Sequence, residues 1–457
     1  MMRLSTVGTI CTQARNKGSD RQLRSLALLG VLLVSACGGN ETIQENRAPG
    51  VRQMRAGYNE IFGGSAKFSA VTASESQTAE VGRSILQNGG NATDAAVAMY
   101  FAMAATLPSA AGLGASGACV VHDAKTRGAE AFVFAPVAAP GPIKGAAFTV
   151  PTGVRALTLM HIRHGQARWE MDVAPGEKIA RFGAPVSRAF ARDLKAGASL
   201  LTDSEARRLF TKDGAPLNEG DNLVQLDLAG TLGTIRRGGG EFFQGNFARV
   251  MSEQVAQAGG NLPVETIRNT VPKAGPPLSE SDGGYRVYVA PSPMAGASAL
   301  AGWKGQAGQG GGVPTDSGGF AGFAAIDEVG NAAACSLSMG QLFGARVVVP
   351  GTGLMLGAPT ADGTAVSPVV IGNPNNGEAK FAGAGAGSAS ASFETGMIAR
   401  LTVNEREVLA DVLAAHAGRG GFVEAISCPY GIKSGGSTCQ AGSDPAGAGL
   451  ALLATRR

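Results

Sequence analysis

The chain has 457 residues, of which 44% are hydrophobic and 16% charged, which is enough for a large core. At roughly 150 residues per domain, that length indicates two or three lobes or one large α/β unit. The 68 glycines show no three-residue period, so the sequence excludes collagen and indicates many tight turns. The net charge of +4 is mild and the basic residues are scattered, so we expect no nucleic-acid partner.

The N-terminal region carries the pattern of an export signal. Basic residues precede the apolar run "SLALLGVLLVSAC", which ends at Cys37. About a dozen apolar residues are too few to span a bilayer and are typical of a signal-peptide core. Small residues before Cys37 form a bacterial lipobox, so we expect a lipoprotein signal peptide over residues 1–36 and a polar tether over residues 37–65. Cys37 would then carry a lipid anchor on the periplasmic side of the envelope; an ordinary cleaved signal is the alternative.

The body begins near residue 66 with the strand-like run "FSAVTASES", followed by two predicted helices. The first spans residues 78–86 and is stopped by the sequence Asn-Gly-Gly at 88–90. The second is capped by Thr93, carries Asp94 in its first turn, and is apolar on every face up to residue 107. A helix that is hydrophobic all round is buried on all sides.

The sequence predicts helices in the middle of the chain and mostly strands in its later part. Residues 150–260 are more polar, with the apolar spacing of three and four that predicts helices. Strand-like runs dominate from residue 285 onward, with helices near "SFETGMIARL" and "EREVLADVLAAHAG". Strands without regular helix alternation predict stacked antiparallel sheets with helices outside, which is an α+β layered fold.

The four histidines give little support for histidine-based chemistry. His161 and His164 are three apart on a predicted helix, but no acidic partner lies at a matching spacing, so a surface pair is favoured over a metal site. His122 and His416 are isolated, and a Gly-x-Ser-x-Gly elbow is absent. The glycine clusters lack the lysine of a phosphate loop. We therefore expect neither a metal nor another cofactor.

A nucleophile that needs no histidine remains possible. A serine or threonine can use its own free α-amine as the base once the chain is cut just before it. The stretch "GVPTDSGGFAGFAAIDEVGN" runs from a glycine-rich loop into an apolar strand and places Asp316 and Ser317 at the junction. Such a junction suits a self-cut, and Ser317 is the candidate nucleophile.

Two pairs of cysteines lie in the body of the chain. Cys428 and Cys439 flank the Pro- and Gly-rich loop "CPYGIKSGGSTC", which is a plausible disulfide in an oxidising compartment. Cys119 and Cys335 lie in apolar runs, so we expect them to be small core residues. Cys-x-x-Cys motifs are absent.

Several segments together resemble one enzyme family. "ESQTAEVGRSILQNGGNATDAAVAM", "GLGASGACVVHDAKT", "EGDNLVQLDLAGTLGTIRRGGGEFFQG", "FAAIDEVGNAAACSLSM" and "AGSDPAGAGLA" occur in the order found in gamma-glutamyltransferases. The resemblance implies the N-terminal-nucleophile αββα sandwich, with a large-subunit-like region at 66–316 and a small-subunit-like region at 317–457 that associate with each other. It also implies a precursor that cuts itself and then cleaves small γ-glutamyl amides such as glutathione.

The family's catalytic positions map onto this chain with several departures. With a short insertion the nucleophile falls on Ser317, whereas gap-free counting gives Phe320, which cannot attack a carbonyl. The arginine that holds the substrate carboxylate is missing near "FVFAPVAAP", where Val137 or Phe132 takes its place.

The remaining positions are also altered. The expected asparagine falls on Gly340 with Gln341 beside it, Asp362 stands in for the acid that holds the α-amine, and the paired serines fall on Thr364 and Ala365. The oxyanion donors are the backbone N–H groups of Ala386 and Gly387.

Three hypotheses follow: an active γ-glutamyl enzyme, a degenerate non-catalytic lipoprotein of the same fold, and an amidase with another acyl preference.

The N-terminal pattern makes a testable prediction. Expressed with its signal, the protein should partition with membranes, because an acylated Cys37 would anchor it. Cys37→Ala should be released or left unprocessed, and membrane fractionation with intact mass of the product measures both. Unchanged membrane retention in that variant would contradict the lipid anchor.

Overall fold

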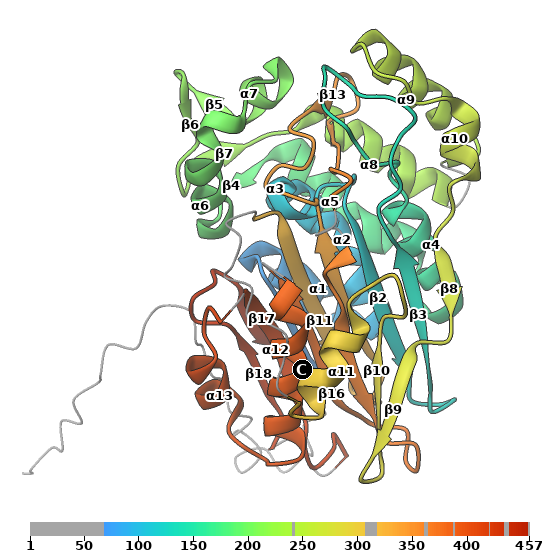
Figure 1. Cartoon of the computed structure of the whole chain (residues 1–457), viewed down its shortest axis with the longest axis vertical. Helices are drawn as coiled ribbons and strands as arrows, with labels where there is room; N and C mark the ends of the chain where they lie inside the picture. The colour runs from blue at the N-terminus through green and yellow to red at the C-terminus, as the bar shows by residue number, and fades with distance from the viewer. Residues whose placement is uncertain are drawn as a thin grey trace, which may run out of the picture. The chain divides into compact units, whose positions relative to one another are not determined.

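Two antiparallel sheets packed face to face form the centre of the molecule (Figure 1). The computed structural model describes residues 68–239, 243–306, 318–360, 364–386, 389–419, 421–433 and 438–455. The first sheet has the order β19 (Leu450–Leu453), β1 (Ala70–Ala73), β11 (Phe320–Ile326), β12 (Ala332–Ser338), β2 (Ser116–Asp123), β3 (Gly128–Phe134) and β8 (Lys273–Gly275). The second has the order β18 (Gln440–Ser443), β17 (Phe422–Ser427), β16 (Ala379–Ala386), β15 (Pro368–Gly372), β10 (Tyr285–Val289) and β9 (Leu278–Asp282).

Helices cover the outer face of each sheet. The first sheet packs against α1 (Ser76–Gln87), α2 (Ala92–Thr106), α3 (Pro108–Ala111) and α4 (Gly153–His164). The second packs against α11 (Gly296–Trp303), α12 (Ala389–Val403) and α13 (Leu409–Ala415). The described residues thus confirm the predicted αββα layering, with strands from both halves of the chain side by side in each sheet.

The remaining elements form a helical cap, whose helices are drawn in shades of green to yellow-green in Figure 1, with the orange β13 beside them. Its helices are α5 (Trp169–Phe182), α6 (Arg188–Gly197), η1 (Ala198–Leu200), α7 (Ser204–Phe210), α8 (Leu226–Gly238), α9 (Asn246–Gln257) and α10 (Val264–Asn269). Short strand pairs join β4 (Ala184–Pro185) to β7 (Asn222–Leu223), β5 (Thr211–Lys212) to β6 (Ala215–Pro216), and β13 (Val348–Val349) to β14 (Leu354–Met355). Among the described residues, no helix combines the length and the apolar character needed to cross a bilayer.

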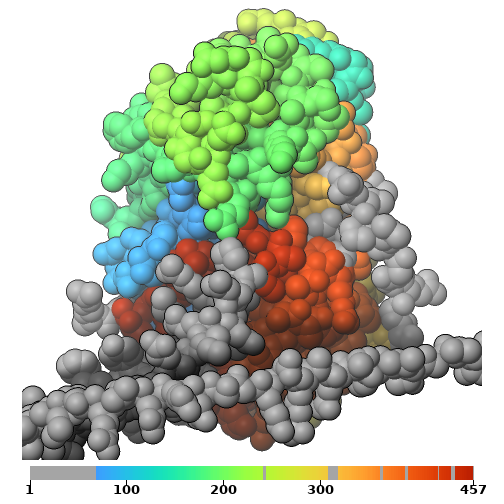
Figure 2. Space-filling view, turned by 90° about the vertical axis from the view of Figure 1, so that its left-hand side faces the viewer, coloured from blue at the N-terminus to red at the C-terminus, as the bar shows by residue number. Residues whose placement is uncertain are grey.

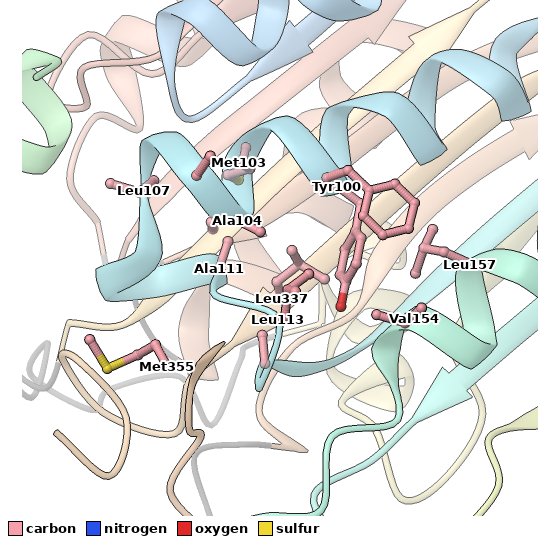
Figure 3. Close-up of a cluster of buried hydrophobic side chains, with 14 of the residues drawn as sticks. Tyr100, Met103, Ala104, Leu107, Ala111, Leu113, Val154, Leu157, Leu337 and Met355 are labelled. Carbon is pink, nitrogen blue, oxygen red and sulfur yellow. The ribbon is translucent and has the colours of Figure 1, made fainter. Parts of the chain in front are cut away.

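Helix α2 is buried along its whole length, as its sequence predicts. Figure 3 shows Tyr100 and Met103 of this helix among side chains from α4 and β12. The start of α4 lies so close that a Cβ on Gly153 would stand 2.3 Å from the Tyr100 hydroxyl oxygen. The predicted cap was wrong: Asn91, not Thr93, caps the helix, and Asn91 forms a reciprocal capping box with Asp94.

Both cysteine pairs form disulfides in the structure. Cys428 and Cys439, which flank the predicted loop, have their Cα atoms 4.2 Å apart. Cys119 and Cys335 are fully buried core residues, as expected, but they also lie directly opposite each other on β2 and β12 and are bonded to each other, which the sequence analysis did not foresee. The register of two neighbouring strands brings together residues that are 216 positions apart in sequence. This second disulfide joins the two halves of the chain.

Thiol chemistry and stability test both bonds. Titration of the denatured, unreduced protein should find all four cysteines blocked. In the chain-entropy picture, and for the uncut chain, in which residues 119–335 form one continuous loop, opening the 216-residue loop should lower the free energy of unfolding by about 5 kcal/mol, against about 3 kcal/mol for the 11-residue loop. Paired alanine variants at each site, made in a chain that also carries Ser317→Ala so that it stays uncut, and compared by urea denaturation, measure the difference. Freely reactive thiols at either pair, or an equal loss of stability, would contradict this prediction.

Candidate active site

Strand β11 begins at a tight backbone crossing. Gly318 and Gly319, which lead into the strand, have positive φ values of 53° and 77°. A Cβ on Gly319 would lie 2.2 Å from the carbonyl oxygen of Gln341, so glycine is required for this approach. In the sequence, the residue before Gly318 is Ser317, the candidate nucleophile. The start of β11 is thereby held against the loop that carries Gln341.

A small pocket opens beside these two glycines. We call it the Gly318 pocket; its lining includes Ser74, Arg192, Asp193, Gly318, Gly319, Phe422, Glu424 and Ala448. These residues come from the end of β1, from α6, from the start of β11, from β17 and from the loop between β18 and β19. Figure 2 shows the green segment that contains α6 lying over the blue N-terminal and red C-terminal segments. The pocket therefore combines residues from both halves of the chain.

One proposed oxyanion donor lies next to this pocket. Ala386 is the last residue of β16 and is the register partner of Phe422 on β17. Since Phe422 lines the Gly318 pocket, the backbone of Ala386 ends within one strand spacing of it. The structure thus brings together the residue after Ser317 and the end of the strand that leads to the predicted oxyanion position.

The structure does not bring the side chains of the other predicted site residues to the Gly318 pocket, or does not describe these residues. Gln341 lies against Gly319 through its backbone, but its side-chain amide donates a hydrogen bond to the Gly344 carbonyl at 2.9 Å. Thr364 is half-buried shortly before β15. Ser317, Asp362, Gly387 and Cys37 lie outside the described residues.

The positions that replace the family's arginine do not line the Gly318 pocket. Phe132 is 1% exposed within β3, and its ring packs edge-on against His164 with the centroids 5.9 Å apart. Val137 is 43% exposed in the segment after β3. Neither residue supplies charge to the pocket.

Glu424 is a fully buried carboxyl on β17 at the Gly318 pocket. Thr72 Oγ1 donates to its Oε2 at 2.7 Å, and Ser443 Oγ donates to its Oε1 at 3.1 Å. Burial raises the pKa of Glu424 to about 8, against the opposing effect of these donors. The carboxyl is therefore protonated at neutral pH and adds no negative charge to the pocket.

Arg192 and Asp193 of α6 bring further charge. Arg192 Nε lies 3.5 Å from Asp193 Oδ1, and the guanidinium carbon lies 4.8 Å from the centroid of the Phe422 ring. Asp193 accepts a short hydrogen bond from Ser109 Oγ at 2.6 Å, and burial raises the pKa of its carboxyl. Sequence reasoning missed Arg192 and Glu424, because both acquire their surroundings from segments far away in sequence.

One histidine prediction was wrong. His161 is not a surface residue: its side chain is 13% exposed, and its Nδ1 lies 2.9 Å from Asp172 Oδ2 and 3.6 Å from Asp94 Oδ1. The acidic partners, which the spacing on one helix could not reveal, come from α2 and α5. The three side chains could hold a metal ion.

The contacts of this cluster favour an internal ion pair. The Asp94 carboxylate already accepts backbone N–H groups from Asn91, Gln166 and Ala167. Despite burial, which alone would lower it, the two aspartates raise the pKa of His161 to about 9. A charged imidazole balances one of the two carboxylates, and burial raises the pKa of Asp172 to about 7, which favours a shared proton over a second negative charge, so we assign no metal to the cluster.

The αββα order of layers defines the class of N-terminal-nucleophile hydrolase folds. The fold matches cephalosporin acylase from Bacillus halodurans with a TM-score of 0.70 and 18% identity, over 91% of this chain and 99% of that chain. At that identity the likeness shows the fold alone.

Sequence comparison identifies the family. The gamma-glutamyltranspeptidase family model matches residues 78–304. The chain is 30% identical over 237 residues to the glutathione hydrolase proenzyme of Bacillus subtilis (strain 168), covering 48% of this chain and 40% of that protein. It is 32% identical over 251 residues to the glutathione hydrolase proenzyme of Escherichia coli (strain K12), covering 50% and 43%. The chain is a divergent member of the gamma-glutamyltranspeptidase family, and its matches span about two fifths of these relatives' length.

The buried carboxyl predicts a pH dependence of stability. Because the pKa of Glu424 is raised in the folded state, that state binds the proton more tightly than the unfolded chain. The free energy of unfolding should therefore fall as pH rises from about 4.5 to about 8, because over this range the folded state holds one proton that the unfolded chain releases. Glu424→Gln should lose this part of the slope, as measured by urea denaturation from pH 5 to pH 9.

A matched control separates this effect from general titration. Asp411 is exposed on α13, so Asp411→Asn should leave the slope as it is in the parent protein. A Glu424→Gln variant with the parent's slope would show that this carboxyl does not titrate between these pH values.

Proposed function

We propose that this chain cleaves γ-glutamyl or related amides through an acyl-enzyme on Ser317, after self-cleavage between Asp316 and Ser317. The observation that carries the proposal is the Gly318 pocket, where the residue after Ser317 lies beside the register partner of Ala386. A nucleophile and an oxyanion donor must both lie about 3 Å from one reacting carbonyl. The relatives named glutathione hydrolase support the same reaction class.

The chemistry depends on the cut. Before it, the backbone nitrogen of Ser317 is an amide and cannot accept a proton. After it, the nitrogen is an amine with a pKa near about 8, which can take the proton from the Ser317 hydroxyl. The oxygen then attacks the amide carbonyl of the substrate, and the backbone N–H groups of Ala386 and Gly387 stabilise the negative oxygen. The protonated amine gives its proton to the leaving amine, and water or an amino acid releases the acyl group.

The departures from the family pattern favour weak turnover of glutathione itself. Val137 provides no guanidinium at the position where the family holds the substrate carboxylate, so the charge-assisted clamp on an amino-acid head is weakened there. An amidase with another acyl preference is the second candidate, and the same departures support it. The expected location is the periplasmic side of the envelope, with the membrane reached through Cys37.

The cut and the activity can be tested together. On a reducing gel the purified protein should split into two pieces, and N-terminal sequencing of the smaller piece should begin at Ser317. The Cys119–Cys335 bond lies across the cut, so on a non-reducing gel the pieces should stay together. Release of a chromogenic amine from a γ-glutamyl anilide measures the activity.

Two variants control this experiment. Ser317→Ala should stay uncut and inactive, whereas Ser317→Thr should cut and react, because threonine offers the same hydroxyl and amine. A single uncut, inactive parent chain would support the degenerate, non-catalytic hypothesis. A cut before Thr315 would keep the enzyme and change its nucleophile.

A further inference from the structure

The partly exposed basic side chain in the lining of the Gly318 pocket points to an anionic ligand. Three charged or titratable side chains line it: Arg192, Asp193 and Glu424. Glu424 is protonated at neutral pH, and the Asp193 carboxyl accepts a hydrogen bond from Ser109 Oγ. Among the described lining residues, Arg192 is the only basic group.

The guanidinium of Arg192 is held in place yet available. Its Nε lies 3.5 Å from Asp193 Oδ1, and its central carbon lies over the Phe422 ring, 4.8 Å from the centroid. Stacking on an aromatic ring fixes a guanidinium while leaving its outer N–H donors free to bind a carboxylate. The Arg192 side chain remains 45% exposed, so a ligand can reach it.

Phe422 connects this guanidinium to the reaction site. The same residue lies under Arg192 and opposite Ala386 in the strand register. A ligand whose carboxylate binds Arg192 would thus place a second carbonyl, a few bonds away, near the end of β16 and the start of β11. The small size of the pocket limits the chain between the two groups to a few carbons.

We infer that Arg192 binds a carboxylate of the acyl group, which makes the substrate a monoamide of a short dicarboxylic acid. This rests on the proposed function for the bond that is cleaved, but the binding itself does not require cleavage. Arg192 supplies, from α6, a cation that the segment around Val137 lacks. It is a specificity-determining residue rather than part of the proton transfers.

The test measures binding in the full chain carrying Ser317→Ala, so that it is independent of turnover. Glutarate should bind more tightly than its uncharged diamide, glutaramide, by isothermal titration calorimetry. Adding Arg192→Gln should weaken glutarate roughly ten- to hundredfold, as expected for loss of hydrogen bonds to a charged group, and should leave glutaramide unchanged. The glutarate affinity of Arg192→Lys should lie between that of the parent and that of Arg192→Gln, because lysine keeps the positive charge but cannot bind a carboxylate through two parallel hydrogen bonds.

A control on the same helix completes the design. Lys195 is exposed on α6 and does not line the pocket, so Lys195→Gln removes the same charge without changing glutarate affinity. A ratio of glutarate to glutaramide affinity that Arg192→Gln leaves unchanged would overturn the inference, as would absence of glutarate binding. Loss of stability without a change in that ratio would assign Arg192 to packing alone. Failure of the proposed function would instead appear as a parent chain, with Ser317 intact, that stays uncut and inactive while the Ser317→Ala variant still binds glutarate.

Discussion

The close packing of β11 on β16 is the constraint on which the candidate site depends. A Cβ on Gly322 of β11 would lie 2.8 Å from the Ala384 side chain of β16, so the two sheets can approach here only because both residues are small. The same contact fixes the relative height of the two strands. It thereby sets the start of β11 against the end of β16, where the two chemical groups of the proposed reaction must meet. The high glycine content and few aromatic residues of the chain suit an interior of this kind.

Strand β11 is also held at its far end. The Asp327 carboxylate accepts backbone N–H groups from Val329, Gly330 and Asn331 in the turn, and a further one from Ala92 at the start of α2. A carboxylate at a helix N-terminus is favoured by the helix dipole. The hairpin is thus attached to the most buried helix at one end and to the Gln341 loop at the other. A strand fixed at both ends can hold its first residues in place without help from neighbouring side chains.

The order of helices and strands could be predicted from the sequence because each depends on local pattern. The all-apolar run of α2 and the glycine stop after α1 are examples, and both hold in the structure. What could not be predicted depends on register between distant segments. Cys119 faces Cys335 only because β2 pairs with β12, and Glu424 is satisfied only because Thr72, 352 residues away, lies on the facing sheet. The cap of α2 was misassigned for a smaller reason: Asn91 and Thr93 are both good capping residues, and the partner of Asp94 decides between them.

Position and specificity are carried by different parts of this fold. The backbone groups that would meet the reacting carbonyl belong to β11 and β16, whose spacing is fixed by sheet packing. The charged group that would select the acyl chain is Arg192 of α6, which is partly exposed and can therefore change without moving the strands. In our proposal, Arg192 on α6 takes the role that the resemblance gives to an arginine in the segment after β3. Under this proposal, the residues around Val137 and on α6 account for the difference in ligand recognition between this chain and its relatives, whereas reactivity depends on the residues at the start of β11.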